Sequence, residues 1–149
     1  MITGYLEPDD GEVTIGNLSI GKDTLEIQNK LGYLSEQSPL YPEMSVWQYL
    51  QYVAKLRGIP AEQQPQAVQQ AIKDTDIAKK ASSYIHTLSK GYRQRVGVAQ
   101  AIIHKPEILI LDEPTSGLDP SQIIAMRDLI KELSKSSTVI LSTHIMQEV

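Results

Sequence analysis

Two adjacent carboxylates follow a run of apolar residues in the last third of the sequence. Residues 108–111 read Ile-Leu-Ile-Leu, and Asp112 and Glu113 come directly after them. Such a run predicts a strand buried on both faces, and open parallel sheets bind ligands at the carboxyl ends of their strands. Asp112 could hold a Mg²⁺ ion on phosphates there, and Glu113 could orient or deprotonate a water. The pair therefore predicts nucleotide chemistry.

A second segment that could bind a ligand lies about one helix before the carboxylates. Residues 88–95 read Leu-Ser-Lys-Gly-Tyr-Arg-Gln-Arg, and Ser89 is a residue type that caps helices. A helix N-terminus offers free backbone N–H groups and partial positive charge to an anion. Taken alone, Ser-x-Gly before a helix is only a cap, so the meaning of this segment depends on the carboxylates at 112 and 113.

Residues 88–95 and 108–119 together resemble the signature motif, Walker B motif and D-loop of the ATP-binding-cassette (ABC) ATPases. The resemblance covers nearly the whole chain. It implies that Asp112 holds the metal and Glu113 acts as the catalytic base. It further implies that Ser89, Lys90 and Gly91 contact the γ-phosphate held by a second subunit of a head-to-tail dimer.

The signature segment departs from the common form of the family. The usual L-S-G-G-Q is L-S-K-G-Y here, so Lys90 replaces the first glycine and Tyr92 the glutamine. This variant resembles that of ATPase subunits of bacterial exporters whose permease is a separate polypeptide. The D-loop match runs through Asp119, which the resemblance places among the nucleotide-binding residues.

Two further positions take their roles from the resemblance alone. His144 follows a predicted strand and Ser142-Thr143, and it matches the switch histidine that contacts the γ-phosphate and the attacking water. Glu36 stands where the family usually has a glutamine that touches Mg²⁺ and couples the site to the permease. A carboxylate can also ligate Mg²⁺. Gln37 remains the alternative, because the loop could be shifted by one residue.

The family's glycine-rich phosphate loop, G-x-x-x-x-G-K-[ST], has no match in this sequence. Residues 16–23 fit the pattern until Asp23, which stands in place of the Ser or Thr hydroxyl. We interpret them as two short strands turning at Gly16-Asn17. Residues 1–11 resemble the family segment on the C-terminal side of the phosphate loop. We therefore expect an internal fragment of a longer domain, with Met1 a chance internal methionine.

The composition excludes several classes of protein. The chain has 149 residues, 41% hydrophobic and 21% charged, which suits one domain with a real core. A net charge of −4 without a basic block gives no electrostatic case for nucleic acid. The chain has no cysteine, so disulfides and thiolate metal sites are excluded. No apolar run approaches the roughly 18 residues of a spanning helix, so any membrane contact should pass through a partner.

The periodicity of apolar residues predicts the elements that position these motifs. We expect short strands before residue 20, a helix at 24–30, a strand at 31–34, and an amphipathic helix at 45–57 closed by Gly58. One or two exposed helices should occupy 61–80, and a helix capped by Ser89 should run to about His104. After the 108–111 strand, Asp119-Pro120 should open a helix. The buried side of that helix should include Ile124 and Met126, and 138–142 should form another buried strand.

The predicted fold is α/β: a P-loop NTPase-like parallel sheet core with an inserted helical signature lobe and an N-terminal antiparallel strand segment. Residues 1–35 and 106–149 are assigned to the core, and residues 36–105 to the coupling loop, helical lobe and signature helix. The resemblance implies ATP and Mg²⁺ as cofactors. It also implies a membrane permease and a second ATPase subunit as partners, and a cytoplasmic location at the inner face of the membrane.

Two other functions remain open from the sequence. The chain by itself could be a non-hydrolysing truncation or interaction module, which nucleotide binding would distinguish. Its parent could also be a soluble ABC ATPase that works on DNA or ribosomes, although no coiled-coil or tandem-cassette insertion occurs within these residues.

Overall fold

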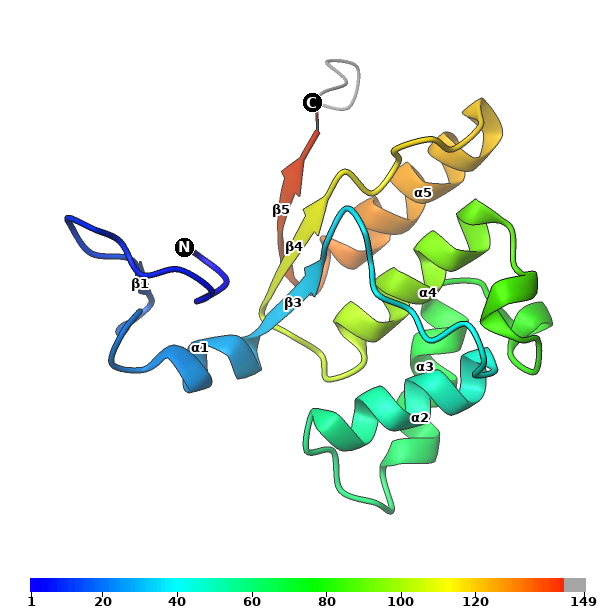
Figure 1. The fold of residues 1–149 in the computed structure, drawn as a ribbon, viewed down its shortest axis with the longest axis horizontal. Helices are drawn as coiled ribbons and strands as arrows, with labels where there is room; N and C mark the ends of the chain where they lie inside the picture. Colours follow the sequence, from blue (N-terminus) through cyan, green and yellow to red (C-terminus); the bar gives the residue numbers. More distant parts are fainter. Residues whose placement is uncertain (144–149) are drawn as a thin grey trace.

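A parallel sheet of three strands forms the centre of the computed structural model, which describes residues 1–143 (Figure 1). The strands are β3 (Leu31–Leu34), β4 (Ile108–Asp112) and β5 (Thr138–Ser142), in the order β3-β4-β5. The predicted parallel core is therefore confirmed. Because β4 is the central strand, its carboxyl end lies in the middle of the row formed by the three strand C-termini, which we call the sheet edge.

The N-terminal segment is an antiparallel hairpin followed by a short helix. β1 (Thr14–Ile15) pairs with β2 (Leu18–Ser19), and Gly16 takes a φ of +59° in the turn between them. The Asp23 carboxylate accepts a hydrogen bond from Ser19 N at 3.0 Å, just before α1 (Thr24–Lys30). The strands turn at Gly16-Asn17 as predicted, and residues 20–23 form a turn into α1, so residues 16–23 are not a phosphate loop.

Three helices form a lobe between β3 and β4. Ser45 caps α2 (Val46–Leu56) in a reciprocal capping box with Gln48. The lobe continues through α3 (Gln64–Asp74) and α4 (Lys90–Ile102), with short 3₁₀ turns η1 (Ala78–Lys80) and η2 (Ile85–Thr87) between them. These helices bury a shared apolar core, which includes Val46, Leu50, Val53, Val68, Ile72, Ile77, Ile85, Val96 and Ala99.

Helix α4 joins this lobe to the sheet. Val96 and Ala99 face the lobe, whereas Val98 and Ala101 contact the apolar layer between the sheet and α5 (Pro120–Leu133). The helix approaches β3 very closely: a Cβ added at Gly32 would lie 2.3 Å from the carbonyl oxygen of Ala101. Only a glycine fits there without moving backbone. The signature helix thus packs in close contact with the sheet.

Two details of the burial prediction are wrong. The strand at 138–142 was expected to be buried, but in β5 alternate residues are exposed, including Ile140 at 40%. β5 is an edge strand whose helix-covered face alone is packed. Ile124 was expected on the buried side of α5 yet is 60% exposed. It stands two residues before the buried Met126, about 200° around the helix.

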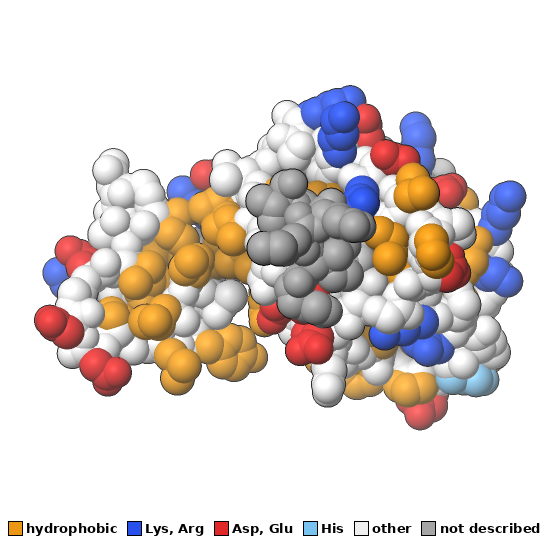
Figure 2. Space-filling view, turned by 90° about the horizontal axis from the view of Figure 1, so that it is seen from above, with side chains coloured by type: hydrophobic (Ala, Val, Ile, Leu, Met, Phe, Trp, Pro, Cys, Tyr) orange, Lys and Arg blue, Asp and Glu red, His pale blue; other side chains and the backbone are white. Residues whose placement is uncertain are grey.

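Apolar side chains also gather on the surface of the N-terminal segment (Figure 2). Met1, Tyr5 and Leu6 are 60%, 85% and 69% exposed, and they line a cavity of about 860 Å³ that reaches Tyr33 on β3. Among the described residues, no helix combines the length and hydropathy needed to cross a membrane.

Candidate functional site

The two carboxylates lie at the carboxyl end of the central strand. Asp112 is the last residue of β4 and is in register with Ser142 of β5. Glu113 leaves the strand with a φ of +48°, a left-handed conformation that costs a non-glycine residue about 1 kcal/mol. Its backbone N–H donates to Ser142 O at 3.0 Å, which holds the turn. The strand end thus presents two consecutive, half-buried carboxylates at the sheet edge.

Tyr33 shares the same face of the sheet as Asp112. It lies on β3 opposite Ile110, and side chains two residues apart on a strand point to the same side. Burial, with the charge of Asp112 as a second cause, raises the pKa of the Tyr33 hydroxyl. The sequence did not single out this residue, because a lone tyrosine in an apolar strand carries no motif.

The loop after Glu113 delivers Asp119 to the start of α5. Ser116 N donates to Glu113 O at 3.1 Å, and Gly117 takes a φ of +66°. The Asp119 carboxylate accepts hydrogen bonds from the Ser121 hydroxyl at 2.7 Å and from Gln122 N at 2.9 Å. Both bonds lower its pKa, the Ser121 bond most. Asp119 is therefore an ionised helix cap on the surface of this loop.

The N-terminus of α4 lies against this loop. Ser89 caps the helix, since its hydroxyl oxygen accepts from Tyr92 N at 3.5 Å. A Cβ added at Gly117 would lie 2.1 Å from Lys90 Nζ, so the lysine side chain lies over the glycine. A Cβ added at Gly91 would lie 2.8 Å from the Gln122 carboxamide. The segments 88–91 and 117–122 are consequently in direct contact within one chain.

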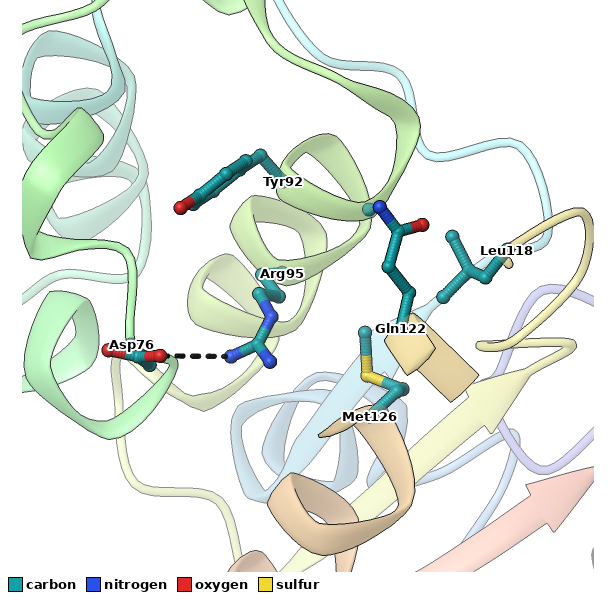
Figure 3. Close-up of a pocket in the computed structure, with 7 residues that line it drawn as sticks. Asp76, Tyr92, Arg95, Leu118, Gln122 and Met126 are labelled. Atoms are coloured by element: carbon teal, nitrogen blue, oxygen red, sulfur yellow. Dashed lines mark ion pairs between the residues drawn. The ribbon is translucent and has the colours of Figure 1, made fainter. Parts of the chain in front are cut away.

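A cavity of about 180 Å³ opens beside this contact, between α4 and α5 (Figure 3). Tyr92 and Gln122 project from the two helices on either side of it, and Met126 closes its base. Arg95 lines the wall, donates to Thr75 O at 2.8 Å and lies 3.9 Å from Asp76 Oδ2. Arg95 thus ties α4 to the end of α3; its place in the 88–95 segment was the only sequence signal for it.

Glu36 and Gln37 are both exposed, and both line a groove of about 450 Å³ between the loop after β3 and the start of α4. Lys90 and Arg93 line the opposite wall. His86 Nδ1 lies 2.9 Å from Pro42 O, which closes one end of the groove. The geometry brings both candidates for the coupling position to the same groove, and it does not choose between them.

A magnesium ion, which the resemblance implies, would have Asp112 and Glu36 as its candidate protein ligands. No cluster of three potential ligands occurs among residues 1–143. Mg²⁺ commonly keeps several waters and takes one or two carboxylates together with substrate phosphates, so this sparse donor set fits it. His144, the predicted switch histidine, lies outside the described residues.

Comparison with known proteins agrees with this arrangement. A family model described as "ABC transporter" matches residues 1–116. The chain belongs to the ABC transporter family. In Bacillus subtilis it is 32% identical to the linearmycin resistance ATP-binding protein LnrL and to the ABC transporter ATP-binding protein NatA, in both cases over 100% of this chain.

The chain spans only part of these ABC relatives, 48% of LnrL and 61% of NatA. Among solved structures it is similar to CbiO1 of Clostridium perfringens, described as part of the ABC transporter complex CbiONQ. That similarity has a TM-score of 0.87 at 28% identity and covers 99% of this chain and 61% of CbiO1. The fold is thus that of an ABC ATPase, and the family to which it belongs binds ATP.

Proposed function

We propose that this chain is part of the ATP-binding and hydrolysing subunit of an ABC transporter, which couples ATP-driven dimer closure to a separate membrane permease. One observation carries the proposal: the capped N-terminus of α4 lies against the loop that links Glu113 to Asp119. A helix end suited to an anion thus contacts the loop that follows the carboxylate pair. The subunit would act in the cytoplasm, at the inner face of the membrane.

In this proposal each residue at the sheet edge has a distinct task. Asp112 would hold Mg²⁺, which when bound neutralises charge on the phosphates. Glu113 would orient the attacking water and accept its proton. His144 would contact the same water and the γ-phosphate. The position of both carboxylates at the carboxyl end of the central strand supports these roles, because parallel sheets bind ligands there.

The signature segment would serve the other subunit of a head-to-tail dimer. Ser89, Lys90 and Gly91 begin α4, where free N–H groups and the helix dipole favour a phosphate. Asp119 would meet the nucleotide of the partner across the same interface. Since residues 88–91 contact residues 117–122, movement of the signature segment on ATP would reach the loop behind Glu113.

Closure would reach the permease through the groove lined by Glu36 and Gln37. We assign residues 1–35 and 106–149 to the α/β core and residues 36–105 to the coupling loop, helical lobe and signature helix. Separate apolar clusters in the lobe and around the sheet support this division, with α4 shared by both. Because the 149 residues contain no phosphate-loop sequence, we expect the chain alone not to hydrolyse ATP.

The full-length protein allows a direct test with two substitutions and their mixture. Glu113→Gln keeps the shape but removes the base, so ATP should still close the dimer while turnover falls by a factor on the order of 10² or more. Ser89→Arg places bulk and charge at the capped helix end and should prevent closure. In a mixed dimer one composite site carries both lesions and the other neither, so some hydrolysis should return.

A matched control is available at the other end of β4. Glu107 precedes the strand, is exposed and pairs with Lys30 at 3.6 Å, so Glu107→Gln should leave ATPase activity unchanged. Size-exclusion chromatography with ATP reports closure, and phosphate release reports turnover. The proposal would be wrong if Glu113→Gln failed to accumulate an ATP-bound dimer, or if Ser89→Arg hydrolysed ATP normally.

A further inference from the structure

Another cavity, of about 450 Å³, lies where the C-terminal ends of α2 and α4 meet the first half of α3. In Figure 1 these helix ends lie away from the carboxyl end of β4, which carries the carboxylates. Two cations line it: Arg57, which follows α2, and Lys105, which follows α4. None of the residues lining it is acidic. The cavity is therefore positively charged although the whole chain carries a net charge of −4.

Arg57 has a charge that the described residues do not balance. Its guanidinium is half-buried, and its Nη1 donates to Gln28 O at 3.3 Å. No carboxylate lies within ion-pair distance of it among residues 1–143. Burial lowers its pKa, which shows that the cation has lost part of its hydration. A guanidinium has five N–H donors in a planar fork, so most of its capacity remains for two oxygens of an anion such as phosphate.

The α3 side of the cavity adds neutral donors, and the ends of α2 and α4 add apolar surface. Gln63, Gln66 and Gln70 lie three or four residues apart, on one side of the helix, and all three line the cavity. The Gln70 amide nitrogen is used by Asp74 at 2.6 Å, whereas the structure shows no side-chain hydrogen bond for Gln63 or Gln66 within the part it describes. Ile59 and Ile103 supply apolar surface.

We propose that this cavity binds a small organic phosphate, with the phosphate at Arg57 and Lys105 and the carbon portion against the isoleucines. Its volume lies within the usual range of small-molecule sites and leaves room for more than a bare phosphate. Lys105 is held with a φ of +54°, at the sharp turn that ends α4. The same chemistry would suit a soluble phosphate ester or the headgroup of an anionic lipid.

The location indicates what such a ligand would do. Arg57 bonds the end of α1 through Gln28 O, and the neighbouring His104 donates from Nε2 to Leu31 O at 3.0 Å, at the start of β3. Both bonds join the helical lobe to the sheet side of the molecule. A bound phosphate would brace this joint and so restrict movement of the lobe relative to the sheet.

We would test the proposal by titrating the 149-residue chain with glycerol 3-phosphate at constant ionic strength. Binding would be monitored through the backbone amide NMR shifts. We expect saturable amide shifts at residues 58–59, 63–64, 66–70 and 103–105, since Pro60 and Pro65 have no backbone N–H. Lys105→Gln and Arg57→Gln should each weaken binding about tenfold, the usual effect of losing a charged hydrogen-bond partner. Lys105 is exposed and has no packing role, so its variant should fold even if Arg57→Gln does not.

Lys55→Gln is the matched control, because Lys55 is an exposed α2 lysine that does not line the cavity. A parallel arm uses phosphatidylcholine vesicles with or without phosphatidic acid: shifts only with phosphatidic acid would support a lipid headgroup as the ligand. The proposal would be overturned if neither glycerol 3-phosphate nor the phosphatidic acid vesicles shifted these amides. It would also be overturned if Lys55→Gln and Lys105→Gln weakened binding equally. Binding should survive Ser89→Arg, so this inference and the proposed ATPase function can fail separately.

Discussion

The helical lobe and the parallel sheet differ in how completely the described residues cover their apolar surfaces. In the lobe, α2, α3 and α4 turn their apolar faces toward one another, and Val46, Leu50 and Val68 are fully buried. In the sheet, α4 and α5 cover one face, while on the other Ile140 is 40% exposed. Parallel sheets are normally covered on both faces. The lobe therefore packs mainly against itself. The second face of the sheet is covered only in part: α1 and the hairpin pack against Ile108 and Ile110, while Ile140 stays exposed among the described residues.

The largest loss of stability should come from a substitution inside the lobe. Leu50→Ala removes a fully buried side chain and should lower the free energy of unfolding by about 2–5 kcal/mol. Ile140→Ala on the open sheet face should cost less than about 1 kcal/mol, because little buried surface is lost. Urea titration followed by the fluorescence of Trp47, the single tryptophan and a lobe residue, measures both. Equal losses would contradict the difference between the regions.

The next largest loss of stability should appear where α4 of the lobe contacts β3 of the sheet. Gly32→Ala places a Cβ 2.3 Å from the Ala101 carbonyl oxygen and should cost about 3 kcal/mol, because backbone must move. Gly58→Ala is the comparison: its φ of +71° is unfavourable for alanine, but nothing lies within 4 Å, so about 1 kcal/mol is expected. A smaller shift of the urea midpoint for Gly32→Ala than for Gly58→Ala would show that α4 can move away from β3.

His104 makes the same joint sensitive to acid. Burial, with the nearby charge of Arg57 as a second cause, lowers the pKa of His104 to about 4 from an ordinary value of 6.5. The folded state therefore favours the neutral ring, and stability should fall as the pH drops from about 6.5 to 4. Thermal melts of His104→Gln, which carries no titrating ring, should show a shallower decline over this window. An unchanged slope would mean that carboxylates alone cause the acid sensitivity.

The smallest expected effect concerns the contact between the signature segment and the Asp119 loop. Two effects should make Gly117→Ala destabilising: the φ of +66° is unfavourable for alanine, and the added Cβ clashes with the Lys90 side chain. In a Lys90→Ala background only the first cost remains. A double-mutant cycle on the free energy of unfolding should therefore give a coupling of about 0.5 kcal/mol. Strictly additive changes would show that Lys90 does not lie over Gly117 in solution.

Local chemistry explains why most elements could be predicted. The predicted helix at 24–30 and strand at 31–34 coincide with α1 and β3. Ser89 and Asp119 cap their helices as expected, since capping depends on the few residues after each cap. The exposure of Ile140 was missed because it depends on the elements that lie over the sheet, which the residues of β5 do not encode.

The sequence by itself determined the motifs, their order along the chain and the order of the elements that carry them, because each depends on residue types at short spacing. Only the tertiary structure decided that Gly91 lies against Gln122, that Tyr33 shares the face of Asp112, and that Arg57 and Lys105 line one cavity. Contacts between distant segments depend on the angle and depth at which helices pack against the sheet. Those quantities are set by close approaches such as that of Gly32 to Ala101, which no local pattern specifies.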